Sequence, residues 1–149
     1  MTEHPPALTQ KELIMLSLSA TLHCLLGCGI GEVTGMVISM AIGLGTVSSI
    51  TLSVLLGFVA GLALGILPLL RHGFTFRNAL KTVIIGEGLS IVVMEAFEVM
   101  TQFAIPGVMT AHLTDGIFWL GMAASLVAGF IAAFPVNYVF VRRGIRHRH

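Results

Sequence analysis

The chain has 149 residues, of which 56% are hydrophobic and only 10% are charged, and its formal net charge is +1. A mean hydropathy of +0.97 excludes an ordinary soluble domain and predicts a single all-α integral membrane domain. Both cysteines, Cys24 and Cys28, lie inside an apolar run, which argues against a disulfide-stabilised scaffold.

A polar lead, residues 1–12, precedes the first predicted span at residues 13–44. Thr9 and Glu12 have the spacing of a capping box, so we expect a helix to begin here. The apolar run is longer than the roughly 20 residues that cross a bilayer, which predicts a tilted or projecting helix. No cleavable signal pattern precedes this run, and we expect it to remain a membrane span.

The rest of the chain predicts three more spans and hence a four-helix bundle. They lie at about residues 47–70, 79–103 and 117–141. The second span carries Gly57, Gly61 and Gly65 at intervals of four residues, a ridge that lets another helix approach closely.

The distribution of basic residues predicts the orientation of the bundle. All eight Lys and Arg residues lie in the lead, in or just after the link between the second and third spans, or in the tail at residues 142–149. The positive-inside rule then places both termini in the cytoplasm, with the basic tail beside anionic lipid rather than bound to nucleic acid. The opposite side carries the longest loop, which contains Met109, His112 and Asp115. Met109 and His112 are candidates to collect ions at an outer mouth.

Short similarities between the two halves point to an internal repeat. Ile-Gly-Glu occurs at residues 30–32 in the first span and again at residues 85–87 in the third. Val-Ala-Gly occurs at residues 59–61 in the second span and again at residues 127–129 in the fourth. We therefore hypothesise that the bundle is a duplicated two-helix hairpin.

The two cysteines lie one helical turn apart, so both sulfurs can face one ion. Thiolate and thioether groups select soft ions such as Cu(I), with Zn²⁺ as the alternative. Met36 and Met40 continue the series in steps of four residues, but each step drifts by about 40° around the helix, so Met40 lies about 160° from Cys24 and cannot join the same site on a straight helix. His23 lies about 100° from Cys24. Two small residues among glycines also simply permit close packing, and both interpretations stay open.

Carboxylates form the second group of candidate residues. Glu87, Glu95 and Glu98 lie in the third span, and Glu32 lies in the first. Each ionised carboxylate near the bilayer centre costs on the order of 3 kcal/mol, and no basic residue is placed to offset that cost. We expect these acids to be protonated, hydrated or balanced by a cation; neutral acids that only hydrogen-bond between helices are the alternative.

The residues around the cysteines follow the pattern His23-Cys24-x-x-Gly27-Cys28-x-x-Gly31-Glu32-x-x-Gly35-Met36. Further matching segments are Leu67-Pro68-Leu69, Met94-Glu95, Pro106-Gly107-x-Met109, Phe118-Trp119 and Phe134-Pro135-Val136-Asn137. In these residues the chain resembles a bacterial family of small membrane proteins catalogued as a domain of unknown function with a His-Cys motif. The resemblance implies four spans in a bacterial inner membrane and an association with copper-handling proteins. The family's Gly-His-Ala-like ending is replaced here by Arg146-His147-Arg148-His149.

Together these features predict a non-enzymatic membrane protein that binds Cu(I), or else Zn²⁺, and transports or delivers it. The expected ligands are Cys24, Cys28, His23, Met36, Met94 and Glu95. Charge balance or proton acceptance is expected from Glu32, Glu87 and Glu98. Two alternatives stay open: a proton- or cation-coupled carrier in which the carboxylates act and the thiols only pack, and a non-catalytic subunit whose glycine ridge docks a partner or forms a homodimer.

Overall fold

The computed structural model describes residues 7–145, which fold into four long α-helices and a short 3-10 turn. The elements are α1 (Gln10–Ala41), α2 (Thr46–Arg71), α3 (Phe76–Ala104), η1 (Val108–Thr110) and α4 (Gly116–Arg142). The all-α prediction is confirmed, and every helix begins and ends within one turn of the predicted span. The predicted capping box at the start of α1 is present, with Thr9 and Glu12 bonded reciprocally. The first six residues of the lead and residues 146–149 of the tail lie outside the described residues.

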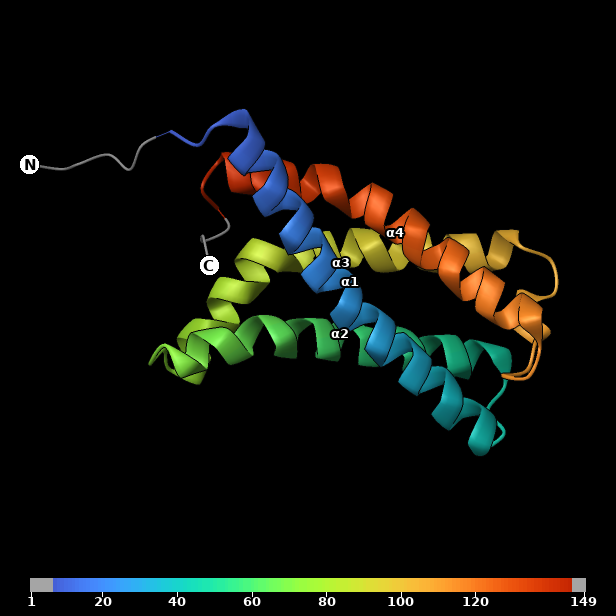
Figure 1. Cartoon of the computed structure of the whole chain (residues 1–149). Helices are drawn as coiled ribbons and strands as arrows, with labels where there is room; N and C mark the ends of the chain where they lie inside the picture. Colours follow the sequence, from blue (N-terminus) through green and yellow to red (C-terminus); the bar gives the residue numbers. More distant parts are fainter. Residues whose placement is uncertain (1–6, 146–149) are drawn as a thin grey trace, which may run out of the picture.

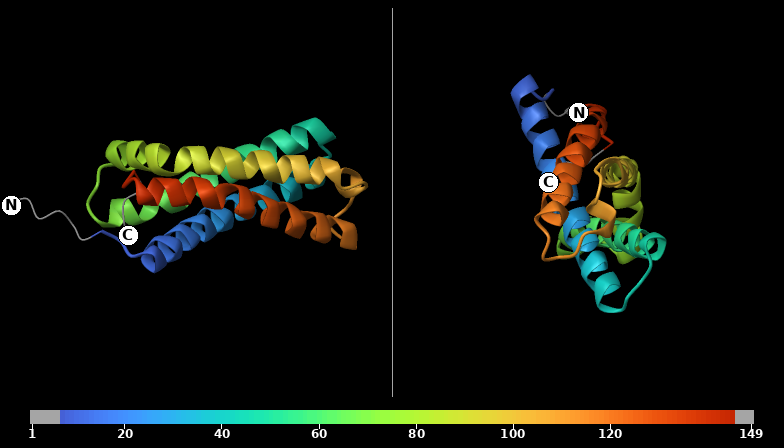
Figure 2. Two further views of the ribbon diagram at one scale, coloured as in Figure 1. Left: turned by 90° about the horizontal axis from the view of Figure 1, so that it is seen from above. Right: turned by 90° about the vertical axis from the view of Figure 1, so that its right-hand side faces the viewer.

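Successive helices run in opposite directions along the bundle (Figure 1). The link from α1 to α2 and the link from α3 to α4 lie at one end, whereas the α2–α3 link and the outer ends of α1 and α4 lie at the other (Figure 2). The lysines and arginines of the helices therefore gather at the second end. The duplication of the hairpin and the side of the membrane on which the termini lie stay predictions.

Three of the four helices, α1, α2 and α4, are long and apolar enough to cross a membrane. Helix α3 has 29 residues, which is also enough to span a bilayer. It is not among the three helices that are apolar enough, and it carries three glutamates. Composition thus supports three of the four predicted spans directly. Helix α3 differs in composition from the other three because it carries three acidic residues, which lie in the interior of the bundle.

The bundle is apolar outside and polar inside. Large side chains such as Leu26, Ile30 and Val59 are about 60% exposed. Glutamate, serine, glutamine and asparagine side chains are buried, among them Glu98 and Asn137 at 0% exposure. An outer surface of this kind is stable against lipid rather than water, which indicates a membrane protein.

Helices α1 and α2 pack through small residues in an antiparallel register. A Cβ atom placed on Gly27 would lie 2.6 Å from Gly61 Cα, and one placed on Gly35 would lie 2.5 Å from Ser53 Cα. Between these two contacts, Gly31 meets Gly57 in the same way. Because all these contacts are with backbone atoms, the two helices approach one another as closely as glycine permits.

The glycine ridge of α2 is covered within the chain. Gly57, Gly61 and Gly65 are all buried, and Cβ atoms placed on them would meet the side chains of Glu95, Ile91 and Glu87 in α3, respectively. In the part of the chain that the structure describes, the helices that pack on the ridge therefore belong to the same chain. That the protein is a subunit that docks a partner or forms a homodimer stays a prediction.

A buried hydrogen bond joins the outer helices and gives a first testable prediction. The Asn137 side-chain amide donates to Thr21 Oγ1 at 3.0 Å, linking α4 to α1. Replacing Thr21 by valine is expected to lower the free energy of unfolding in detergent micelles by about 1 kcal/mol, a typical value between membrane helices. Thr34→Val is the matched control, because that exposed hydroxyl bonds only the Ile30 carbonyl of its own helix. Equal losses in the two variants would show that the interhelical bond contributes nothing.

Candidate metal centre

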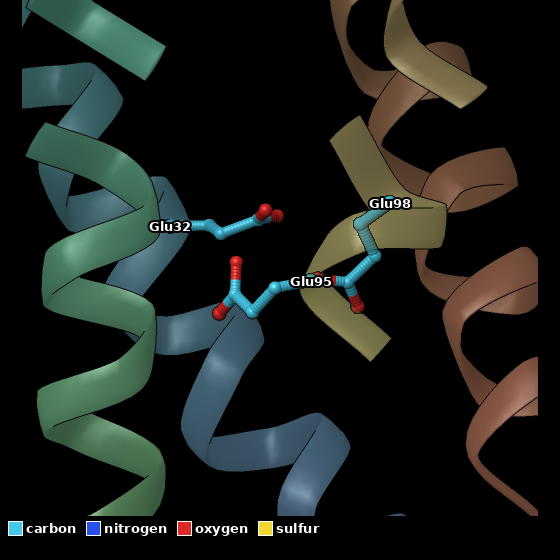
Figure 3. A group of neighbouring side chains, drawn as sticks. All are labelled: Glu32, Glu95 and Glu98. Atoms are coloured by element: carbon cyan, nitrogen blue, oxygen red, sulfur yellow. The ribbon is translucent and has the colours of Figure 1, made fainter. Parts of the chain in front are cut away.

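Three carboxyl groups converge in the interior of the bundle. Glu32 comes from α1, and Glu95 and Glu98 come from α3; one carboxylate oxygen from each lies within 4.8 Å of the others. All three side chains are at most 3% exposed. Figure 3 shows the carboxyl groups pointing into the space between the helices. Two of the three acids of α3 are thus joined by the acid of α1.

Glycines of the other two helices make room for these acids. A Cβ atom on Gly129 of α4 would lie 2.7 Å from Glu98 Oε1, and a Cβ atom on Gly57 of α2 would clash with Glu95 Oε1. All four helices of the bundle therefore help to form the cluster. Helices α1 and α3 provide the carboxyl groups, and α2 and α4 provide glycines that leave space for them. From the sequence alone, Gly57 is assigned only to helix packing and Gly129 has no role. Each of these glycines faces an acid of another helix, and this contact can be recognised only once the fold is known.

The carboxyl groups lack conventional partners. Five buried oxygens, namely Glu32 Oε2 and both oxygens of Glu95 and Glu98, accept no hydrogen bond from an amide, amine or hydroxyl group of residues 7–145. The nearest basic residues along α2, α3 and α4 lie about 20 Å from the cluster, at a rise of 1.5 Å per residue. The charge of these acids is therefore not balanced along these helices, which leaves protons or a bound cation to balance it.

The thiols form an adjoining cluster. Cys24, Cys28 and Met94 are each 0% exposed and pack in one group with Ile91 and Ala133. The Cys28 residue also lies next to the Glu95 carboxyl group. Cys28 is thus the residue at which the sulfur cluster meets the carboxylate cluster.

Three of the predicted site residues lie elsewhere. His23 is half-buried and belongs to neither cluster, because it points about 100° away from Cys24. Met36 packs instead against Ala111, Phe118 and Met122, as the drift of about 40° in each step of four residues dictates. Glu87 faces Gly65, more than two turns before Glu95.

The fold and the interior groups define a helical membrane bundle with a polar core. A family profile described as a domain of unknown function, DUF4396, matches residues 16–146, and the chain belongs to this family. No curated protein and no solved structure gives a significant match to the chain.

Proposed function

We propose that the protein binds Cu(I) in the interior of a bacterial inner membrane and transports or delivers it, with α3 as the fourth span and both termini in the cytoplasm. Cys24, Cys28 and Met94 would supply the sulfur ligands, and the three clustered glutamates would balance charge. The observation that carries this proposal is the position of Cys28, which packs with the other two sulfur residues and also lies beside Glu95 of the carboxylate cluster.

The chemistry of the two clusters is complementary. Thiolate and thioether sulfur select Cu(I), and a thiol must lose its proton to become a ligand. When Cu(I) replaces the protons of Cys24 and Cys28, two protons are released in a region far from water. The adjacent carboxylates can accept them, which neutralises acids whose ionised form is costly in the membrane. Zn²⁺ is the alternative ion, since it accepts both cysteine sulfur and carboxylate oxygen.

The convergence of the acids also favours a second candidate, a proton- or cation-coupled carrier. The three carboxylate oxygens lie within 4.8 Å of one another, whereas the cluster that holds the cysteines packs against apolar side chains such as Phe58 and Leu62. In this candidate the carboxylates bind the moving ion and the cysteines only fill space.

A binding titration separates the two candidates. The wild type and the Cys24→Ser/Cys28→Ser variant are titrated anaerobically with Cu(I) in competition with a chromophoric chelator. We expect the variant to bind Cu(I) at least about 100-fold more weakly, which corresponds to about 2.7 kcal/mol. Ser17→Ala is a matched control, because Ser17 is a small buried polar side chain of α1 that lies outside both clusters and bonds the Leu13 carbonyl of its own helix. Undiminished affinity in the cysteine variant would remove the sulfur site and leave the carrier.

A further inference from the structure

A cavity of about 300 Å³ lies at the end of the bundle that carries no lysine or arginine in its links. Its walls come from the end of α1 and the link after it, the start of α2, Gln102 of α3, η1 with the loop after it, and the start of α4. The cavity is separate from the carboxylate and sulfur clusters described above, and no residue of those clusters lines it.

The lining of this cavity contains an unusual set of soft donors. Met36 and Met40 line it from α1, and Met109 lines it from η1; His112 lines it from the loop. These residues are far apart in the sequence and are brought together by the fold. Thioether sulfur is a poor hydrogen-bond acceptor but a good ligand for Cu(I) and similar soft ions.

A second observation in the cavity is an unpartnered hydroxyl group. Ser39 also lines the cavity, is 1% exposed, and its Oγ atom has no hydrogen-bond partner among the described residues. Buried polar groups in proteins nearly always have a partner, which can be a ligand or its bound water. A hydrated or partly hydrated cation in the cavity would supply one.

The cavity also lies next to the interior site along two helices. Met36 follows Glu32 by one turn of α1, and Gln102, which lines the cavity and is buried, follows Glu98 by one turn of α3. Helices α1 and α3 run in the same direction (Figure 1), so on both helices one turn leads from a clustered acid to a residue that lines the cavity. Along α1, the candidate groups then follow in the order Met40, Met36, Glu32, Cys28 and Cys24.

We infer that this cavity is a second binding site, which takes a soft monovalent cation such as Cu(I) or Ag(I) through Met36, Met40, Met109 and His112. Thioethers need not lose a proton to bind, so the cavity can take the ion before the thiols do. The onward path of the ion to the interior rests on the proposed function, whereas binding in the cavity does not.

The test uses the full chain in detergent micelles with Cys24 and Cys28 replaced by serine, so that the interior sulfur site is absent. In this background, Met36→Leu/Met40→Leu/Met109→Leu is expected to weaken Ag(I) binding at least about tenfold, since it removes three soft ligands. The control is Met15→Leu/Met100→Leu, which changes two methionines that are 59% and 55% exposed on the outer surface. Leucine conserves the volume of methionine in all five positions. Equal Ag(I) affinity in the two variants would overturn the inference.

A second measurement needs no substitution in the cavity. The methyl groups of methionine are labelled with ¹³C in the same cysteine-free background, and Ag(I) is added stepwise. The signals of Met36, Met40 and Met109 are expected to shift before those of Met15 and Met100. Simultaneous shifts of all five signals would contradict a cavity site. This result does not depend on whether the interior site binds Cu(I). The experiment therefore distinguishes a failure of the cavity proposal from a failure of the proposed function.

Discussion

Replacing Glu95 and Glu98 together by glutamine is expected to reduce Cu(I) flux into proteoliposomes by about 10- to 100-fold, the usual effect of removing groups that support a metal site. Glutamine keeps the size of each side chain but cannot accept the protons that Cys24 and Cys28 release. Those protons would then remain on the thiols, where they compete with Cu(I) for the sulfur atoms. Flux is followed with a Cu(I) indicator inside the vesicles.

The matched control for this experiment is Glu87→Gln on the same helix, because Glu87 is buried but lies outside the carboxylate cluster. We expect it to retain nearly full flux. The double variant is expected to fold, since replacing unbalanced buried acids by neutral side chains of the same shape removes a cost rather than a contact. Wild-type flux in the double variant would show that the clustered acids take no part in ion movement.

A single methyl group at Gly31 is expected to destabilise the bundle more than any other alanine substitution in α1. Its Cβ atom would lie 2.5 Å from Gly57 Cα and would also clash with the Leu56 carbonyl oxygen. Both are backbone atoms of α2, so no side chain can rotate away and the helices must separate. We expect Gly31→Ala to lower the free energy of unfolding by about 3 kcal/mol, at the upper end of the usual range for overpacking.

Gly88→Ala in α3 is the control for this prediction. Gly88 is also buried in a helix, but a Cβ atom there meets only Ile84 Cγ2, at an ordinary 3.7 Å. Alanine at this position should leave stability unchanged or raise it by up to about 1 kcal/mol, because alanine favours helix more than glycine does. Unfolding of both variants by detergent or heat measures the difference. A Gly31→Ala protein as stable as Gly88→Ala would contradict the close α1–α2 contact.

Much of the fold follows from local sequence signals. The capping box at Thr9, the glycines at helix ends and the lengths of the apolar runs give the four helices to within a turn. The buried face of α1 also follows, since Cys24, Cys28 and Gly31 recur at helical intervals. These signals are local, and each depends on residues within one or two turns of one another.

The site depends on contacts that local patterns do not contain. The sequence shows acids in α1 and α3, but not that Gly57 and Gly129 make room for two of them. It also indicates the glycine ridge without showing that α1 of the same chain fills it. Met36 and His112 are distant in sequence, and only the fold places them in one cavity. Such contacts depend on the register between helices. The helical periodicity within one span carries no information about that register.

We propose that sulfur from Cys24, Cys28 and Met94 binds Cu(I) inside the bundle. X-ray absorption at the copper edge tests it directly, on the full chain with Met36, Met40 and Met109 replaced by leucine and one equivalent of Cu(I) added. The account predicts a first coordination shell made of sulfur, which disappears when both cysteines are also replaced by serine. A shell of oxygen and nitrogen alone, or a protein that retains no copper, would contradict it.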